Sequence, residues 1–390
     1  MLDFYFMKGM YVHMKIRYFD NAATTRVKEE VLKEMIPYYT EKYGNPSSMY
    51  TKGREAKKAI EEARGKVARL INCKPNEIFF TGSGTESDHM AIKGIAYANW
   101  RKGRHIITTK IEHPAVLHTC QNLENHGFEV TYLNVNSEGF INLDDLKNAI
   151  RNDTILISIM FANNEIGTIQ PITEIAKIAK MYNIIFHTDA VQACGNIQID
   201  VKEMNIDLLS LSGHKIYAPK GIGVLYIRNG IEFDKIIDGG HQEKNKRAGT
   251  ENVPGIVGLG KACELARDNL EIHIKHLKEM RDYYIAQVKE KIQNAKLNGT
   301  LERRLPGNAN FSFEKIGGEE LLYKLDAKGI CASSGSACTT GSANPSHVLT
   351  AIGLTSELAN KALRTSFGED TTKEDIDYLI KSLIEIMEEE

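Results

Sequence analysis

The chain has 390 residues, of which 42% are hydrophobic and 26% are charged, and its 49 lysines and arginines against 51 acidic residues give a net charge of −2. This composition excludes disordered and collagen-like chains, and the near balance of charge argues against a protein that binds duplex DNA. No window approaches 18 consecutive apolar residues, and the six cysteines include no C-x-x-C pair, so we expect no membrane-spanning helix, disulfide scaffold or zinc knuckle. The composition predicts a cytoplasmic protein of two or three domains.

The first fourteen residues are apolar and aromatic, but three polar residues interrupt them, whereas a signal peptide needs an unbroken apolar run. We therefore expect no signal peptide here. The hypothesis that follows is that translation begins at Met10 or Met14. The methionines at which it could begin are Met1, Met7, Met10 and Met14.

From residue 77 onward, short runs rich in β-branched and aromatic residues alternate with helix-length segments such as 86–102 and 172–182. Several runs are apolar on both faces, which is typical of buried strands in a largely parallel sheet. This alternation predicts a wound α/β architecture. The seven predicted strands are 77–81, 105–111, 129–135, 154–162, 184–190, 208–212 and 223–227.

Near Pro254 the pattern changes to a long helical stretch that runs to about residue 296. Shorter strands such as 308–314 follow, and a last helix is expected at about 373–387. We predict a large α/β domain over residues 16–253, whose N-terminal segment contributes to the small domain. A smaller α+β domain is predicted over residues 254–390.

Two residues follow neighbouring predicted strands and could act together. Asp189 falls where the strand 184–190 should end, and ligands bind at the carboxyl ends of strands in open α/β sheets. Lys215 lies just beyond the strand 208–212. A turn aspartate and a solvated lysine are the plain alternatives. As a pair they fit pyridoxal 5'-phosphate, which needs a lysine for its aldehyde and a carboxylate for its ring nitrogen.

A phosphate site is predicted where the strand 77–81 runs into the glycine-containing turn 82–85, because a helix should begin near Glu86. Backbone N–H groups at a helix N-terminus bind phosphate, although simple helix capping would need the same turn. No Lys-Ser/Thr pair follows the glycines, which excludes a Walker motif. Further donors that could join this site are Ser212, His214 and Thr250.

Cys338 lies in the segment 329–346, whose Gly, Ser, Ala and Thr residues predict a loop with glycine hinges at 335 and 341. A cysteine on an exposed loop is accessible as a thiolate. Arg364 lies in a strand-like run, where its guanidinium could bind a substrate carboxylate or form a surface salt bridge. The remaining cysteines, which we expect to be small buried hydrophobic residues, are Cys73, Cys120, Cys194, Cys263 and Cys331.

Nine ordered blocks, which span the chain from about residue 16 to its end, resemble the NifS/IscS-type cysteine desulfurases of the class V aminotransferase family. The resemblance implies a fold-type I pyridoxal-phosphate architecture, a mostly parallel seven-stranded sheet and a homodimer. The blocks are YFDNAATT (18–25), GNPSS (44–48), TESD (85–88), EHPAV (112–116), NNEIG (163–167), HTDAVQ (187–192), SGHKIYAPKGIGVLY (212–226), RAGTEN (247–252) and SGSACTTGS (334–342).

The resemblance also implies roles for residues around the cofactor ring. Lys215 resembles the lysine that binds the cofactor aldehyde, and Asp189 the carboxylate that pairs with the pyridine nitrogen. His113 would stack on the ring and move protons. Asn164 and Gln192 resemble the groups that bond the ring hydroxyl and the substrate region.

The same resemblance implies roles at the phosphate and the substrate. Thr250 would reach the phosphate bound by the partner subunit, and Arg364 would bind the substrate carboxylate. Cys338 resembles the nucleophile that accepts sulfur. The residues that would hold the cofactor phosphate within one subunit are Gly84, Thr85, Ser212 and His214.

The activity implied is removal of sulfur from L-cysteine, which leaves L-alanine and a persulfide on Cys338. The sulfur would then pass to an acceptor such as an iron–sulfur scaffold or a tRNA-thiolation protein. No resident metal is required, although Cys338 could ligate an iron–sulfur cluster transiently. The alternatives are a selenocysteine lyase or other pyridoxal-phosphate cysteine lyase, an aminotransferase, and a non-catalytic partner subunit. Cys338 argues against the other enzymes, and the set of Lys215, Asp189 and His113 argues against the non-catalytic subunit.

Overall fold

The structure is a computed structural model, which describes residues 15–335 and 345–389. The candidate start methionines and Cys338 lie outside the described residues. Within the described part of the chain, no helix combines the length and the apolar character that crossing a membrane requires.

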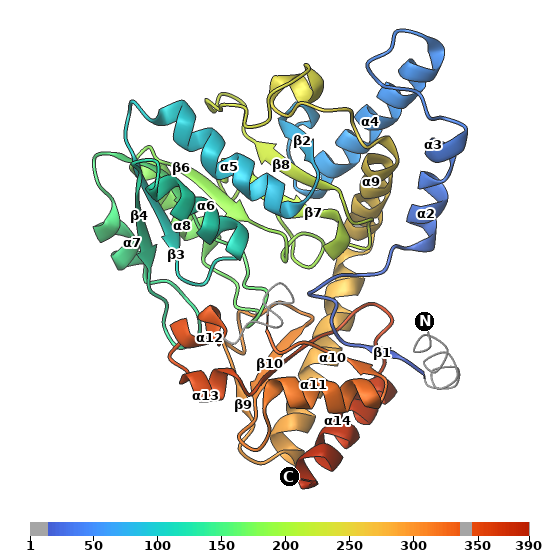
Figure 1. Cartoon of the computed structure of the whole chain (residues 1–390), viewed down its shortest axis with the longest axis vertical. Helices are drawn as coiled ribbons and strands as arrows, with labels where there is room; N and C mark the ends of the chain where they lie inside the picture. The colour runs from blue at the N-terminus through green and yellow to red at the C-terminus, as the bar shows by residue number, and fades with distance from the viewer. Residues whose placement is uncertain (1–14, 336–344, 390) are drawn as a thin grey trace, which may run out of the picture.

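A seven-stranded sheet forms the upper half of the molecule in Figure 1, with the strand order β2-β8-β7-β6-β5-β3-β4. All neighbouring pairs are parallel except those of β8, which runs antiparallel to β2 and β7. The predicted wound α/β fold is therefore confirmed. The strands are β2 (Ile78–Thr81), β3 (His105–Thr109), β4 (Glu129–Leu133), β5 (Thr154–Ser158), β6 (Ile185–Asp189), β7 (Leu208–Ser212) and β8 (Gly223–Ile227).

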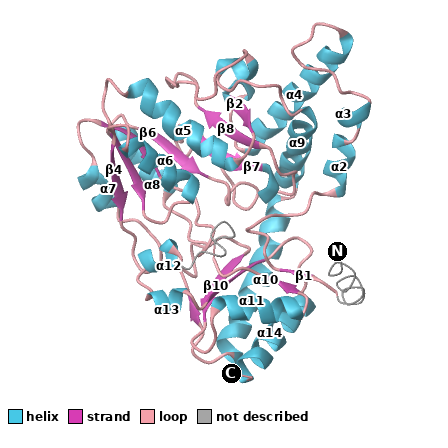
Figure 2. Ribbon diagram, in the orientation of Figure 1, coloured by secondary structure: helices cyan, strands magenta, loops and turns pink. Residues whose placement is uncertain are grey.

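Helices cover both faces of this sheet, as Figure 2 shows. Neighbouring residues of one strand point to opposite faces. Ile107 accordingly packs in the core beneath α4 (Thr51–Leu70), α8 (Ile172–Met181) and α9 (Val253–Asp268). Ile106 packs in the core beneath α5 (Gly84–Asn99) and α6 (Pro114–Glu124). Burial on both faces explains why the strands read as continuous apolar runs. The other helices of this half are α2 (Glu29–Met35), α3 (Pro37–Thr40) and α7 (Leu143–Ala149).

The lower half of the molecule has its own core. A three-stranded antiparallel sheet in the order β12-β10-β9 packs against the long α10 and two further helices. Strand β1 (Arg17–Tyr18), from the N-terminal segment, pairs in parallel with β11 (Ile330–Cys331). The remaining elements are β9 (Lys296–Leu297), β10 (Asn308–Ser312), β12 (Ala362–Ser366), α10 (Leu270–Lys291), α11 (Gly318–Ala327), α12 (His347–Ala351), α13 (Ser356–Ala359) and α14 (Lys373–Glu388).

Several predicted ends differ from the structure by one to three residues, and two predicted elements differ more. The predicted strand 154–162 is shorter in the structure, where β5 ends at Ser158, although Ile159 N and Phe161 N still donate to the carbonyl oxygens of His187 and Asp189. The chain then turns at Asn163, whose Oδ1 accepts hydrogen bonds from the backbone of the next turn. The long helical stretch is two helices that meet at Asn269. Helix α9 packs in the core of the large sheet, whereas α10 packs in the lower core. The division into domains at residue 253 remains a prediction.

Candidate active site

The carboxyl ends of β6 and β7 bring together Asp189 and Lys215, two of the residues predicted to bind the cofactor ring. These strands are parallel neighbours, and Asp189 at the end of β6 pairs in register with Ser210 of β7. Strand β7 ends at Ser212 and runs directly into the 3-10 turn Gly213–Lys215. Because the turn is so short, Lys215 stays at the same edge of the sheet as Asp189. This is the edge at which ligands bind in open α/β sheets.

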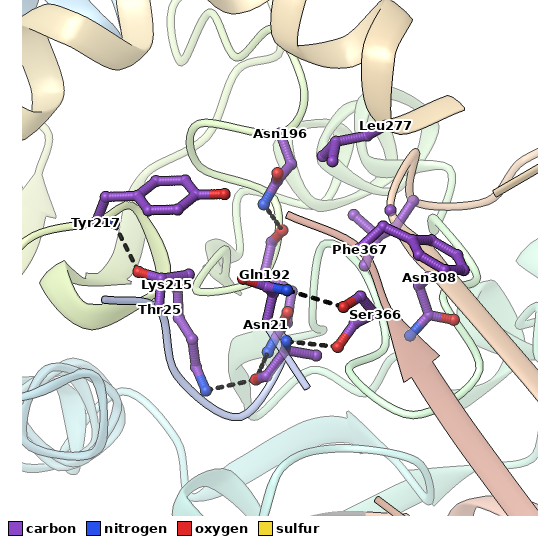
Figure 3. Close-up of a pocket in the computed structure, with 13 residues that line it drawn as sticks. Asn21, Thr25, Gln192, Asn196, Lys215, Tyr217, Leu277, Asn308, Ser366 and Phe367 are labelled. Carbon is purple, nitrogen blue, oxygen red and sulfur yellow. Dashed lines mark hydrogen bonds between the residues drawn. The ribbon is translucent and has the colours of Figure 1, made fainter. Parts of the chain in front are cut away.

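The N-terminal segment crosses this edge and contacts Lys215. The Lys215 Nζ donates hydrogen bonds of 2.6 Å to the carbonyl oxygens of Ala22 and Ala23. Gln192 Nε2 also donates to the Ala22 oxygen, at 3.0 Å. The cavity drawn in Figure 3 is lined by Lys215 and Gln192 from the upper half of the molecule and by Ser366 from the lower half. The site therefore lies between the two cores.

Asp189 is buried, and the backbone N–H of Val191 donates to its Oδ1 at 2.9 Å. Burial raises the pKa of Asp189, while the neighbouring His113, the Val191 hydrogen bond and the charge of Lys215 act in the opposite direction. A buried carboxyl of this kind is suited to bind a protonated ring nitrogen, whose charge would favour its ionised form. His113 begins α6, where its Nδ1 accepts a hydrogen bond from Ala115 N.

The turn between β2 and α5 has the close packing that a phosphate cradle requires. A Cβ atom at Gly84 would lie 2.8 Å from Val191 Cγ2 and 3.2 Å from Ser212 Cβ, so only glycine fits without displacing them. The helix N-terminus therefore lies directly against the end of β7. Ser83 caps the helix by accepting from Glu86 N at 3.1 Å. This arrangement fits a phosphate, which accepts hydrogen bonds from free N–H groups at a helix start.

His214 lies in the 3-10 turn that follows Ser212, and its Nδ1 is 3.2 Å from Thr24 Oγ1. Burial, reinforced by the charges of Lys215 and Lys220, lowers the pKa of His214 to about 4. The imidazole is therefore neutral near pH 7, and it can donate one hydrogen bond without adding a charge.

Arg364 is 1% exposed and lies on β12, at the boundary between the two cores. Its Nη1 donates to the carbonyl oxygen of Asn164 at 3.2 Å, and its Nη2 donates to Asp20 Oδ1 at 2.7 Å. Its Nε finds no acceptor among the described residues. The alternative of a surface salt bridge is corrected in one respect: Arg364 does form a salt bridge, with Asp20, but the pair is largely shielded from solvent, and the guanidinium retains an unused donor.

Of the predicted residues that the structure describes, Lys215 and Gln192 line the cavity of Figure 3, and two others, Thr85 and Thr250, are exposed. Thr85 is exposed on the first turn of α5. Thr250 is also exposed, and it lines a different hollow together with Gly82 and Arg247. Within one subunit the structure therefore gives Thr250 no contact with Lys215 or Asp189.

The cysteines correct part of the prediction from sequence. Cys120, Cys194 and Cys263 are buried as predicted, but Cys73 and Cys331 are half-buried. Cys331 ends the short strand β11, where burial raises the pKa of its thiol. A thiol with a raised pKa is a poor nucleophile near neutral pH.

Three groups close to the site were missed from sequence: Asp20, the carbonyl oxygens of Ala22 and Ala23, and Glu112. They lie in the blocks YFDNAATT and EHPAV, so the blocks marked the segments but not the atoms. Glu112 is fully buried and adjoins His113. Its Oε1 accepts from Thr109 Oγ1 at 2.7 Å and from Met160 N at 3.0 Å. Burial raises the pKa of Glu112 to about 8 despite these hydrogen bonds.

We expect Glu112 to make the protein less stable as the pH rises. The folded state keeps the Glu112 proton up to about pH 8, whereas the unfolded carboxyl, with its usual pKa of 4.5, loses it earlier. The stabilisation is complete below pH 4.5 and is lost as the pH rises through about 8, by at most about 1.4 kcal/mol per pH unit. In Glu112→Gln this contribution should be absent. Urea unfolding of both proteins across this range measures it, and parallel pH profiles would contradict the prediction.

The fold and the edge formed by Asp189 and Lys215 define a class, the fold-type I pyridoxal-phosphate proteins. The comparison with known families agrees: the "Aminotransferase class-V" family matches residues 17–379, and the chain belongs to this family. It is 56% identical over 374 residues to "Cysteine desulfurase IscS" of Clostridium botulinum, covering 95% of this chain and 94% of that protein. It is 57% identical to "Cysteine desulfurase IscS" of Methanosarcina thermophila, covering 96% and 92%.

The solved structures that are similar to this one include two at about 40% identity. A structure titled "NIFS-LIKE PROTEIN" is 41% identical with a TM-score of 0.90, and the match covers 96% of this chain and 100% of that one. A structure titled "SspA in complex with cysteine" is 39% identical with a TM-score of 0.79, covering 91% and 100%.

Proposed function

We propose that this chain is a pyridoxal-phosphate-dependent cysteine desulfurase, which converts L-cysteine to L-alanine and leaves a persulfide on Cys338. The observation that carries the proposal is the N-terminal segment, which contacts Lys215 through Ala22 and Ala23 and Arg364 through Asp20. Lys215 and the Arg364 guanidinium, whose Nε has no acceptor among the described residues, are thereby held at one boundary between the two cores. The high identity to cysteine desulfurases over nearly the whole chain supports the same activity.

Pyridoxal 5'-phosphate, when bound, supplies an aldehyde that captures amines and a ring that withdraws electrons. Lys215 would bind that aldehyde, and Asp189 would hold the ring nitrogen protonated. His113 and Gln192 would contact the ring and its hydroxyl. The phosphate would be held by Gly84, Thr85, Ser212 and His214. The close packing at Gly84 and the neutral state of His214 support this assignment.

Arg364 would bind the substrate carboxylate through the guanidinium edge that carries Nε, with Asn164 beside it. The unused Nε donor supports this role, because a buried donor without an acceptor costs free energy until a ligand supplies one. Lys215 Nζ, after the substrate amine has replaced it, would take the proton from Cα of the bound cysteine. Its amine would act as the general base in this step.

Cys338 would attack the substrate sulfur as a thiolate, which forms an S–S bond to the protein and breaks the substrate's Cβ–S bond. The described residues on each side of the segment 336–344 support this role by their position. Before it, Ser333 pairs with the backbone of Arg364. After it, Ser346 Oγ donates to Glu165 Oε2 at 2.6 Å. Both attachments adjoin the proposed substrate site, which favours transfer by proximity.

The proposed enzyme is a homodimer in the cytoplasm. Exposed hydrophobic residues gather along residues 32–50, which include α2 and α3, and a patch of this kind marks an interaction surface. Thr250 is exposed and could therefore reach the phosphate bound by a partner subunit. The sulfur acceptor would be an iron–sulfur scaffold or a tRNA-thiolation protein. The exposed residues are Leu32, Ile36, Tyr39, Tyr43, Met49 and Tyr50.

The test is the reaction of the purified protein, supplied with pyridoxal 5'-phosphate, with L-cysteine and a thiol reductant. We expect equal amounts of alanine and sulfide, and a protein that sediments as a dimer. Before reductant is added, mass spectrometry should find one extra sulfur on the peptide that contains Cys338. Activity on L-selenocysteine alone, without protein-bound sulfur, would instead support a selenocysteine lyase.

A further inference from the structure

We propose that Asp20 is a positioning residue, which orients the Arg364 guanidinium so that its Nε edge receives the substrate carboxylate. The proposal rests on the function proposed above for Arg364. Asp20 reaches Arg364 from the other end of the chain, 344 residues away, and its Oδ1 accepts from Nη2 at 2.7 Å. The ion pair is shielded, since the side chains are 16% and 1% exposed.

The guanidinium is held at two of its three nitrogens. Asp20 binds Nη2, and the carbonyl oxygen of Asn164 accepts from Nη1 at 3.2 Å. Nε alone lacks an acceptor among the residues that the structure describes. A planar guanidinium held at both terminal nitrogens cannot rotate about its last bonds, so the direction of its Nε–H is set by Asp20 and Asn164.

Asp20 is itself held by the strand that carries Arg364. Asp20 forms a bridge with Ser366 of β12, and Ser366 N donates to Phe19 O at 2.7 Å. On the other side, Ser366 Oγ accepts from Ala22 N at 2.8 Å. Asp20 therefore lies opposite Ser366, which is two residues beyond Arg364 on β12. A backbone fixed on both sides limits the movement of the carboxylate, which is the condition for orienting another group.

The charge of Asp20 also changes how a substrate is recognised. A buried guanidinium without a partner would be costly, and the Asp20 carboxylate neutralises it. The carboxylate of an incoming substrate then meets a neutral pair, so the attraction depends on the direction of the remaining N–H donor more than on net charge. Recognition of this kind is sensitive to the orientation that Asp20 provides.

Asp20→Ala and Asp20→Asn test the proposal in the holoenzyme. We expect Asp20→Ala to raise KM for L-cysteine by about tenfold or more, with a smaller change in kcat, because a hydrogen bond to a charged group is lost. Asp20→Asn keeps an oxygen that can accept from Nη2 and should recover most of the affinity. The matched control is Asp370→Ala. The Asp370 side chain is 67% exposed, and its Oδ2 lies 2.9 Å from Nη2 of Arg26 at the surface. The control should change KM by less than about twofold.

Two competitive inhibitors separate positioning from general disturbance. Cysteamine has the thiol and amine of cysteine but no carboxylate, and 3-mercaptopropionate has the thiol and carboxylate but no amine. In Asp20→Ala, the inhibition constant of 3-mercaptopropionate should rise as much as KM does, while that of cysteamine should stay unchanged. If Asp20→Ala does not fold, the same selective rise, at reduced size, is required of Asp20→Asn.

The proposal is overturned if both inhibitors weaken together, if neither changes, or if Asp20→Asn loses as much affinity as Asp20→Ala. Failure of the proposed function looks different, because the unaltered protein would then make no alanine or sulfide from L-cysteine. If the wild type is active and Asp20→Ala keeps the wild-type preference for 3-mercaptopropionate over cysteamine, only the role of Asp20 is rejected, and the proposed function stands.

Discussion

Replacing Lys215 with alanine should reduce the formation of alanine and sulfide from L-cysteine by about 10³-fold or more, because the variant loses both the amine that binds the aldehyde and the base at Cα. No other lysine lines the cavity drawn in Figure 3 among the described residues. After borohydride reduction and denaturation, the wild type should keep the cofactor covalently attached, and the variant should not.

The control for this result is Lys220→Ala, since Lys220 is an exposed lysine five residues further along the chain. Its activity should stay within about twofold of the wild type. Lys215→Ala also leaves the carbonyl oxygens of Ala22 and Ala23 without their 2.6 Å donors, so thermal unfolding should be measured alongside. A folded Lys215→Ala protein with substantial activity would refute the assignment of Lys215.

Replacing Cys338 with alanine should lower sulfide and alanine formation by about 10²-fold or more while the cofactor stays bound, because the sulfur loses its positioned acceptor. The protein-bound persulfide should disappear from the mass spectrum. Absorbance of the bound cofactor should match that of the wild type, which would show that the rest of the site is intact.

Cys331→Ala is the matched control, because Cys331 precedes Cys338 by seven residues and is half-buried in β11. Burial raises the pKa of its thiol, so little thiolate is present near neutral pH. Its activity should stay within about twofold of the wild type. Full activity in Cys338→Ala would mean that the protein is a lyase that needs no persulfide.

Much of the fold could be predicted because the information is local. Burial on both faces makes the strands of the large sheet continuous apolar runs, and these runs stand out in the sequence. The ends of the strands and helices were predicted less accurately. Strand β5 stops at Ser158, and the break between α9 and α10 at Asn269 carries no glycine or proline. The helical spacing of apolar residues continues across this break. The break is therefore visible only in the structure, where α9 and α10 pack in two different cores.

Some features of the candidate site could likewise be predicted from local sequence, and others only from the tertiary structure. Asp189 and Lys215 could be paired from sequence because Asp189 ends one strand and Lys215 closely follows another, and the ends of parallel neighbours meet at one edge. The sequence by itself therefore determined the class of fold, and it predicted the cofactor chemistry and the segments that would carry the site. The tertiary structure alone decided that Asp20 binds Arg364, that Ala22 and Ala23 bind Lys215, and that Glu112 is buried enough to hold a proton. Contacts between residues hundreds of positions apart depend on how the two cores pack, which no local pattern records.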